Sequence, residues 1–309
     1  MLNLRQLEYL IALSETRNFR RAAERVNATQ PTLSGQVKAL ETRLGAQLVE
    51  RSKNKVMLTQ LGDEVVGIAR RMLADANEIR VLASRGGAEL SGVLRLGLPS
   101  TIGPYLLPLV IPELQSRYPQ LQLYVREELP GTLPHSLENG TYDLAISLLP
   151  VIASDLECAP LFREPLTLAV SKRHPLAAKK KANQSALKGI DILALGRGYQ
   201  LHDAVTALCK DFGANLKYEY EGTSLDTLRE MVAMNLGATF LPGLYVESVA
   251  SRDTNIKTVK LEGRQNYRTV GLIWRKTTSR RKSYLELADV LRDAIRENFP
   301  QFVVHSSRI

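Results

Sequence analysis

The sequence predicts a small helical N-terminal domain with a winged helix-turn-helix, a long linker helix, and a larger α/β domain. Three observations support this fold class. Residues 19–51, FRRAAERVNATQPTLSGQVKALETRLGAQLVER, contain two amphipathic helix patterns joined by a short polar turn. Residues 59–87 carry an apolar seven-residue repeat. From residue 91 onward, strand patterns alternate with helix patterns.

The positive charge of the chain is concentrated at its N-terminal end. The 309 residues are 44% hydrophobic and 24% charged, as in typical globular proteins, and the formal net charge is +9. Residues 1–60 hold ten Lys and Arg against five Glu, and so contribute +5 of that charge. A basic module on a near-neutral remainder indicates a polyanionic partner, with a merely solvated basic face as the alternative.

Asparagines mark the start of the first two predicted helices. Asn3 with Gln6 three residues later has the spacing of a capping box. Asn18 precedes the second helix, and the break at 27–28 ends it. The residues on its buried face are Phe19, Ala22, Ala23 and Val26.

The third helix is the one predicted to enter the DNA major groove. Thr29 caps it, Pro31 occupies its first turn, where a missing N–H group is tolerated, and Gly45 ends it. Its predicted buried stripe is Leu33, Val37, Leu40 and Leu44. Two helices joined by about three residues form a helix-turn-helix, which is typical of DNA-binding proteins.

The polar face of the third helix supplies candidate DNA contacts. Short or forked polar side chains can reach base edges, and the free N–H groups of a helix N-terminus can hold a phosphate. The candidates are Thr29, Gln30, Pro31, Thr32, Ser34, Gln36 and Lys38. For Gln36 and Lys38, ordinary solvation of a helix surface is the alternative.

Residues 48–58 predict a β-hairpin wing after the third helix. Apolar residues at 48–49 and 56–58 flank a polar, basic turn. Arg51, Lys53 and Lys55 are expected to contact the phosphate backbone, which sets affinity more than sequence preference.

A long helix is predicted after Thr59. Apolar residues recur every seven positions, and a second set of apolar residues lies three or four positions away from the first. These residues are Leu61, Val65, Ile68, Met72, Ile79 and Leu82. A seam sustained over about three heptads favours pairing of two such helices, and packing on the same chain is the alternative. The helix is expected to end at a hinge, Gly86-Gly87.

The α/β region predicts two subdomains with a cleft between them. Strands are expected near 94–98, 121–125, 144–148, 166–170, 191–195, 217–221, 238–241 and 268–274. Helices are expected after Pro104 and at 201–212, 224–236 and 283–297, with Gly213 and Gly237 as C-terminal stops. The alternation predicts parallel sheets covered on both faces. Subdomain I comprises about 91–164 and 268–300, and subdomain II about 165–267.

Taken together, these segments resemble the LysR-type transcriptional regulators along the whole chain. Within that family the chain is most similar to the peroxide-sensing OxyR group, through IGPYLLP (102–108), GYQLHDAVTALC (198–209), EGTSLDTLREMVA (221–233) and FLPGL (240–244). The resemblance implies a winged helix-turn-helix DNA-binding domain at 1–58, a linker and dimerisation helix at 59–87, and an effector-binding domain at 91–309 similar to periplasmic binding proteins. It also implies a homotetramer, built as a dimer of dimers, that binds a pseudo-palindromic site in double-stranded DNA and acts with RNA polymerase.

One position departs from the OxyR pattern. By the resemblance, Gln200 replaces the reactive cysteine of that group and Tyr199 replaces the histidine before it, while Cys209 matches the resolving cysteine. An amide cannot form a sulfenic acid, so a disulfide switch through Gln200 is excluded. The alternative function is an oxidative-stress switch that pairs Cys209 with Cys158 or with another chain. Two buried cysteines acting as small hydrophobic residues are the other interpretation.

The candidate effector site lies where three helix N-termini are expected to point into the cleft. Hydroxyls and free N–H groups at helix N-termini favour a small anionic or polar molecule. The candidates are Ser100, Thr101, Tyr199, Gln200, His202, Thr223 and Ser224. By the resemblance, Thr101 also matches a threonine that assists peroxide binding. Helix capping alone would explain each Ser or Thr, and His202 fits a plain surface residue equally well.

Other classes of protein are not favoured by the sequence. It has no GxSxG, HExxH, P-loop or CxxC motif, and its four histidines lie far apart, so we expect neither an enzyme nor a metal or cofactor site. No apolar run reaches the ~20 residues of a membrane span. No signal-peptide pattern opens the chain, so a cytoplasmic location is expected. A solute-binding protein of the transport type would lack residues 1–60 and would carry an export signal.

Overall fold

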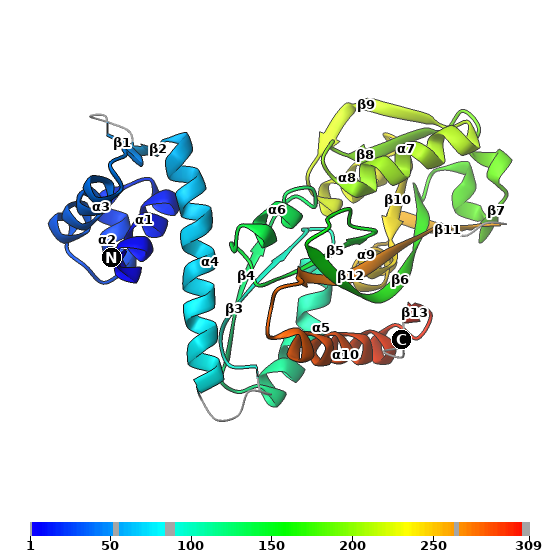
Figure 1. Ribbon diagram of the computed structural model, residues 1–309. Helices are drawn as coiled ribbons and strands as arrows, with labels where there is room; N and C mark the ends of the chain where they lie inside the picture. The colour runs from blue at the N-terminus through cyan, green and yellow to red at the C-terminus, as the bar shows by residue number, and fades with distance from the viewer. Residues whose placement is uncertain (1, 52–55, 84–89, 263–265, 305–309) are drawn as a thin grey trace. The chain divides into compact units, whose positions relative to one another are not determined.

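The chain forms two units with separate hydrophobic cores (Figure 1). The structure, a computed structural model, describes residues 2–51, 56–83, 90–262 and 266–304. The N-terminal unit comprises residues 1–87 and 136–142, and the C-terminal unit comprises 88–135 and 143–309. Within the described ranges, no helix combines the length and the apolar character that a membrane crossing requires.

The N-terminal unit contains the predicted helix-turn-helix and wing. Its elements are α1 (Leu4–Thr16), α2 (Phe19–Arg25), α3 (Gln30–Leu44), β1 (Val49–Arg51), β2 (Val56–Leu58) and α4 (Gln60–Ala83). The predicted caps are confirmed: the Asn18 side chain accepts two N–H groups of α2, and Thr29 accepts the N–H of Thr32. Gly45 ends α3 in the left-handed conformation, at φ 65°.

Two details of the N-terminal unit differ from the prediction. Leu44 is exposed rather than part of the buried stripe, because α3 ends at this residue and Leu48 fills the core instead. Gln6 does not complete a capping box with Asn3. Its side-chain amide donates to Gln36 Oε1 at 2.9 Å, so Asn3 alone caps α1.

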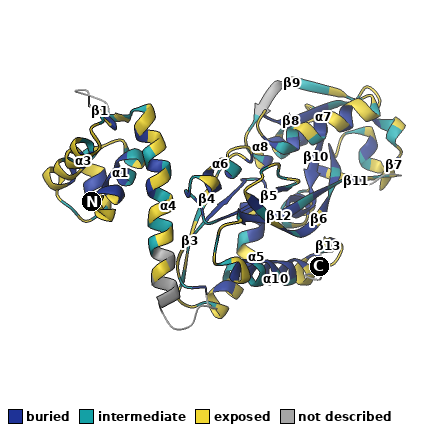
Figure 2. Cartoon of the chain, in the orientation of Figure 1, coloured by how far each residue is buried: buried dark blue, intermediate teal, exposed yellow. Residues whose placement is uncertain are grey.

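Helix α4 has one face in the core and another that is uncovered (Figure 2). Val66 and Ala69 are buried on the face that packs on α1. Val65 is half-buried. The exposed residues of the predicted apolar seam are Leu61, Ile68, Met72 and Ile79. The side chain of Leu82 and the pair Gly86-Gly87 lie outside what the structure describes.

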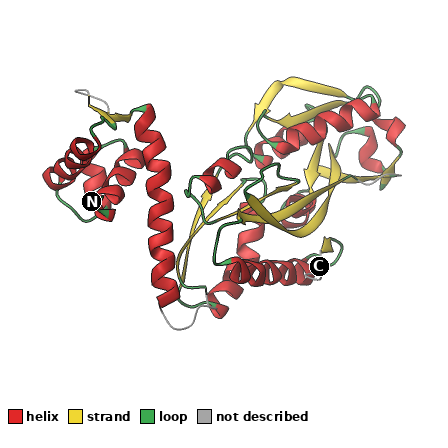
Figure 3. Cartoon of the chain, in the orientation of Figure 1, coloured by secondary structure: helices red, strands yellow, loops and turns green. Residues whose placement is uncertain are grey.

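The remainder of the chain is a mixed α/β structure (Figure 3). Its helices and strands are β3 (Gly92–Leu98), α5 (Gly103–Arg117), β4 (Leu121–Glu127), α6 (Leu133–Glu138), β5 (Leu144–Leu149), β6 (Leu156–Ser171), β7 (Lys181–Ala182), β8 (Asp191–Leu195), α7 (Gln200–Phe212), β9 (Asn215–Gly222), α8 (Leu225–Ala233), β10 (Thr239–Pro242), α9 (Gly243–Ser248), β11 (Ile256–Leu261), β12 (Tyr267–Arg275), α10 (Arg281–Asn298) and β13 (Val303–Val304). Short 3₁₀ helices lie at Pro175–Ala178, Gln184–Leu187 and Ala250–Arg252.

The main sheet is mixed, so the prediction of parallel sheets was wrong for most of it. The strand order is β4-β3-β5-β12-β6-β11-β7, and β10 and β13 also pair with β6. Strands β4, β3 and β5 are parallel neighbours, whereas β12 runs antiparallel to both β5 and β6. The physical reason is the path of the chain. It leaves the first half of the unit along β6 and runs back into it along β12, so these two strands run in opposite directions.

Strand β6 belongs to both halves of the C-terminal unit. Residues 156–165 of this strand run beside β12, with a bulge at Leu161, and from Leu166 onward the strand pairs with β10 and β11. We call β3, β4, β5 and β12 with α5 and α10 the first lobe, and β7 to β11 with α7 to α9 the second lobe. The partner change at 165–166 lies next to the predicted subdomain boundary at 164–165.

One predicted helix stop is correct and the other is wrong. Helix α7 ends at Gly213, at φ 67°. Helix α8 closes earlier than predicted, because Asn235 rather than Gly237 takes the left-handed position, at φ 65°. Gly237 instead lies where a side chain would be too close to β8. A Cβ atom there would lie 3.0 Å from the carbonyl oxygen of Asp191. The short elements α6, α9 and β11 were not predicted from the sequence.

Candidate functional site

Helix α3 presents a polar, uncovered face that begins at its N-terminal turn. Thr29 Oγ1 lies 2.7 Å from Thr32 Oγ1 and also accepts the N–H of Thr32. Ser34 is half-buried. The exposed candidates are Thr29, Gln30, Pro31, Thr32, Gln36 and Lys38. The first turn is therefore both capped and accessible, as a helix that enters a groove requires.

Gln36 is partly committed to contacts within the N-terminal unit. Its Oε1 atom accepts a hydrogen bond from Gln6 Nε2 at 2.9 Å, and Gln6 Oε1 accepts one from Arg43 at 3.5 Å. Gln36 therefore retains N–H groups for a base edge, while its carbonyl oxygen already has a partner.

Several cations of the N-terminal unit are engaged in salt bridges. Arg25 and Arg70 both pair with Glu15, at 2.6 and 2.8 Å, and so join α2 and α4 to the end of α1. Lys38, in contrast, forms no ion pair with any residue in the described part of the chain. The arginines therefore stabilise the fold, whereas Lys38 is available to a phosphate or a base.

The wing is a two-stranded antiparallel hairpin. Val49 lies opposite Leu58 and Arg51 lies opposite Val56. The side chain of Arg51 and the residues Lys53 and Lys55 lie outside the described residues, so their contacts with phosphate stay predictions.

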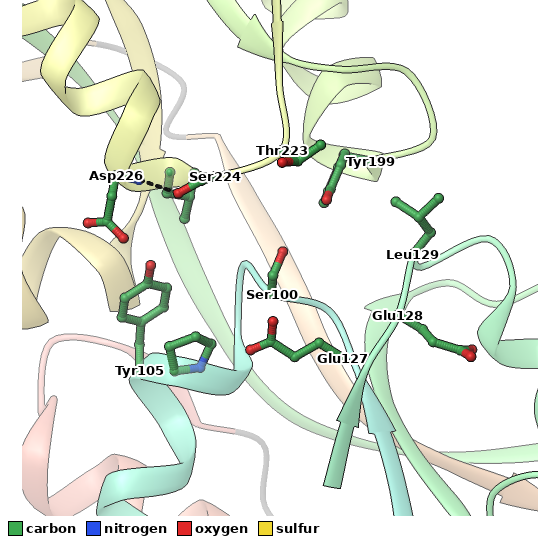
Figure 4. A pocket seen from close by; sticks show the side chains of 11 residues that line it. Ser100, Tyr105, Glu127, Glu128, Leu129, Tyr199, Thr223, Ser224 and Asp226 are labelled. Atoms are coloured by element: carbon green, nitrogen blue, oxygen red, sulfur yellow. Dashed lines mark hydrogen bonds between the residues drawn. The ribbon is translucent and has the colours of Figure 1, made fainter. Parts of the chain in front are cut away.

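A pocket opens where the carboxyl end of β4 meets the N-termini of α5, α7 and α8 (Figure 4). Its cavity volume is about 480 Å³. The lining residues are Ser100, Pro104, Tyr105, Glu127, Glu128, Leu129, Tyr199, Thr223, Ser224, Leu225 and Asp226. We call this the cleft pocket, because both lobes contribute to it.

The structure brings four of the seven predicted effector residues together in the cleft pocket. They are Ser100, Tyr199, Thr223 and Ser224. Ser224 also caps α8, since its Oγ accepts the N–H of Asp226 at 3.2 Å.

The other three predicted effector residues do not line the pocket. Thr101 is buried, and its carbonyl oxygen accepts a hydrogen bond from Arg268 at 3.0 Å. His202 Nδ1 lies 2.8 Å from the carbonyl oxygen of Leu195. Gln200 begins α7, and its buried Oε1 has no hydrogen-bond partner among the described residues.

Acidic and phenolic groups dominate the pocket. Asp226 Oδ1 accepts the hydroxyl of Tyr245 at 2.8 Å. The pKa of Tyr105 is raised far above its ordinary value, first by burial and then by the charges of Asp226 and Glu127. Tyr105 therefore stays protonated at neutral pH and adds no charge of its own.

Sequence reasoning missed Tyr105, Glu127, Glu128 and Asp226. Glu127 and Glu128 come at the end of a predicted strand, and open α/β sheets collect ligand-binding groups at the carboxyl ends of their strands. That signal could have identified the two glutamates. Asp226 was hidden in the first turn of a helix, where an acidic residue is expected for stability alone.

The two cysteines are free thiols in different environments. Cys158 is exposed on β6, and Cys209 is buried on α7. Burial raises the pKa of Cys209 to about 11. At neutral pH this side chain is almost entirely in the thiol form, which is the unreactive one.

The comparisons with known protein families cover both units. The family described as "LysR substrate binding domain" matches residues 87–296. The family described as "Bacterial regulatory helix-turn-helix protein, lysR family" matches residues 4–63.

Individual relatives match almost the whole chain. The chain is 40% identical over 293 residues to the DNA-binding transcriptional dual regulator OxyR of Escherichia coli, covering 94% of this chain and 95% of the relative. It is 38% identical over 296 residues to the hydrogen peroxide-inducible genes activator of Haemophilus influenzae, covering 96% and 98%.

Solved structures of similar proteins share the fold. A full-length OxyR variant from Pseudomonas aeruginosa matches with a TM-score of 0.79 at 35% identity, covering 97% of this chain and 96% of that one. A hydrogen-peroxide-bound OxyR mutant from Corynebacterium glutamicum matches with a TM-score of 0.67 at 29% identity, covering 97% and 96%. The chain belongs to the LysR family of bacterial helix-turn-helix regulatory proteins.

Proposed function

We propose that this LysR-type DNA-binding transcriptional regulator is switched by a small polar molecule that binds in the cleft pocket. The observation that supports the proposal is the origin of the lining residues. Ser100 and Tyr105 come from the first lobe, and Tyr199 and Thr223 come from the second. A ligand that contacts both lobes binds one arrangement of them better than others, which is the requirement for a ligand to shift a conformational equilibrium.

The coupling that such a switch needs is modest. A hundredfold change in DNA affinity corresponds to about 2.7 kcal/mol, within the usual range of allosteric coupling. A few hydrogen bonds gained in one arrangement and lost in the other supply that amount.

The DNA contacts belong to the same proposal. The exposed face of α3 reads base edges, and the cations of the wing bind phosphates. Pairing through α4 gives two recognition helices and therefore a pseudo-palindromic DNA site. A homotetramer, contact with RNA polymerase and a cytoplasmic location complete the proposal.

A ligand screen followed by a DNA-binding assay tests the switch. Small polar molecules are first screened by thermal shift on the full-length protein, and DNA affinity is then measured on fragments selected by the protein from a random pool. We expect compounds that raise the melting temperature also to change DNA affinity. Tyr199→Phe and Thr223→Ala should abolish both effects. If bound compounds leave DNA affinity unchanged, the proposed switch is wrong.

A redox switch through Cys209 is the second candidate, favoured by the names of the relatives that are called hydrogen peroxide-inducible genes activators. The burial and raised pKa of Cys209 argue against it. Peroxide treatment followed by counting of free thiols separates the two functions. Unchanged thiol counts together with unchanged DNA affinity would exclude the redox switch.

A further inference from the structure

The charge of the cleft pocket is opposite to the one that the helix N-termini predict. Three lining side chains are carboxylates, Glu127, Glu128 and Asp226, and none of the lining residues is Lys, Arg or His. Glu127 and Asp226 alone contribute two negative charges, and the N-termini of α5, α7 and α8 contribute about half a positive charge each, so the pocket keeps a net negative charge. A small anion is therefore disfavoured.

Two of these helix N-termini already have a carboxylate of their own. Asp226 lies in the first turn of α8. The carboxylate of Glu127 lies close to Gly103, the first residue of α5. A Cβ atom added to this glycine would be 3.4 Å from Glu127 Oε1. Because these acidic groups compensate the helix dipoles, an incoming anion would gain little from the N-termini.

Two buried tyrosines provide an independent indication of a ligand. Tyr105 is 9% exposed and Tyr199 is 8% exposed. Neither hydroxyl forms a hydrogen bond with any residue that the structure describes, and both residues line the open pocket. Figure 4 shows the Tyr105 hydroxyl directed toward Asp226, and the Tyr199 hydroxyl directed into the space above Ser100. Both groups are held in place by their rings and can donate and accept hydrogen bonds.

Asp226 forms no direct ion pair and is linked to Arg229 through the hydroxyl of Tyr245. Its partner Tyr245 is neutral, and Arg229 donates to the Tyr245 hydroxyl at 3.1 Å. Arg229 itself pairs with Asp253 and with Glu230. Within the described part of the chain, neither Asp226 nor Glu127 forms an ion pair.

We infer that the cleft pocket binds a small organic cation, a molecule with a protonated amine or guanidine group. This inference rests on the proposed function and names the class of its effector. The charged nitrogen lies between Glu127 and Asp226, against the ring and hydroxyl of Tyr105, where a cation gains from the π face as well as from the carboxylates. The hydrocarbon part lies against Leu129 and Leu225.

An organic cation suits this pocket better than a metal ion. Among the described residues, no three His, Cys, Asp or Glu side chains are close enough to hold a metal. The volume of about 480 Å³ is that of pockets which enclose small organic molecules.

Three four-carbon compounds of matched length test the charge of the ligand. Putrescine is a dication, butanediol is neutral and succinate is a dianion, and agmatine adds a guanidine group. Thermal shift and calorimetry on the full-length protein, at constant ionic strength, should show binding of putrescine or agmatine. Butanediol and succinate should not bind.

Isosteric variants test the residues. Glu127→Gln and Asp226→Asn should each weaken binding of the cation by roughly tenfold, because each removes one charge of the pair. Glu297→Gln removes an exposed carboxylate on α10 and should leave binding unchanged. Circular dichroism verifies that each variant is folded.

The outcomes separate this inference from the proposed function. If succinate or butanediol binds most tightly and Tyr199→Phe weakens that binding, the effector pocket stands and the cation inference is overturned. If Glu297→Gln weakens cation binding as much as Glu127→Gln does, general surface charge is responsible and the inference is also overturned. If no compound of the panel binds, the cation inference is overturned, whereas the proposed function is rejected only if the wider screen of small polar molecules also yields no ligand.

Discussion

Arg268 and Glu164 form a buried ion pair where β12 and β6 run side by side, with Arg268 Nε 2.6 Å from Glu164 Oε1. The other carboxylate oxygen of Glu164 accepts the N–H of Leu244 at 2.5 Å, near the start of α9. The guanidinium also donates to the carbonyl oxygen of Thr101, just before α5. One ion pair thus joins both long strands to the beginnings of two helices, one from each lobe.

Removing the charge of Glu164 should destabilise the C-terminal unit strongly. Glu164→Gln leaves the Arg268 guanidinium buried without a counter-ion, which costs about 3–5 kcal/mol of the free energy of unfolding. Trp274, the only tryptophan of the chain, is buried on β12, so its fluorescence during denaturant unfolding reports this loss.

The exposed pair of Glu157 and Arg281 is the matched control. Glu157→Gln should cost far less than Glu164→Gln, because the Arg281 side chain remains solvated. Equal losses for the two variants would show that burial of the Arg268 pair is not what stabilises this region.

Two substitutions in the N-terminal unit should affect DNA binding in different ways. Gln30→Ala should weaken binding mainly to the selected sequence, by about 1–3 kcal/mol, because Gln30 is exposed at the start of α3. Lys53→Ala should weaken binding to all sequences. It should also reduce the slope of log affinity against log salt concentration by about one, the contribution of one phosphate contact. Gel shifts on specific and random DNA at several salt concentrations measure both effects. A sequence-selective loss for Lys53→Ala would contradict the assignment of the wing to phosphates.

A charge in the exposed seam of α4 should disrupt self-association. Ile68→Glu places a carboxylate among Leu61, Met72 and Ile79, and a paired helix could not bury it without a large cost. We expect a lower mass in analytical ultracentrifugation and weaker DNA binding. Ile152→Glu is the control, because Ile152 is 99% exposed and lies outside α4. An unchanged mass for Ile68→Glu would exclude this face as the dimer interface.

The burial of Cys209 should appear in the pH dependence of stability. Its pKa rises from an ordinary value of 9.0 to about 11 because burial disfavours the thiolate. The folded state therefore favours the neutral thiol, and this contribution is complete below pH 9 and is lost as the pH rises through 11. Cys209→Ala should show a smaller loss of unfolding free energy across that interval than the unchanged protein.

Alkylation provides an independent measure of the burial of Cys209 relative to the exposed Cys158. Iodoacetamide at neutral pH should modify Cys158 rapidly in the folded protein and Cys209 only after denaturation, as read by mass spectrometry. Rapid modification of both thiols in the folded state would restore the redox candidate.

Local signals in the sequence predicted the N-terminal unit well. Asn18, Thr29 and Gly45 lie where the structure has the ends of α2 and α3, because capping depends on a few neighbouring atoms. The same reasoning failed at α8, where Asn235 rather than Gly237 adopts the left-handed conformation. Two residues that both tolerate positive φ within one short segment cannot be distinguished without the packing around them.

Features that depend on distant residues were not predictable in this way. The antiparallel direction of β12 follows from its return between lobes, and strand patterns contain no information about direction. The acidic character of the cleft pocket arises because Glu127 and Asp226, almost a hundred positions apart in the chain, face the same cavity. Helix N-termini alone predicted the opposite charge.

The passage of β6 through the junction limits how the lobes can move. Strand β6 pairs with β12 up to Pro165 and with β10 from Leu166 onward, so a sharp bend between the two would break ladder hydrogen bonds. A change in the twist of the paired strands keeps those hydrogen bonds, because paired strands in a sheet are already twisted. We therefore expect effector binding to rotate the lobes about the strand axis by a small angle, which displaces Ser100 relative to Thr223 without the wide closure of a hinged lid.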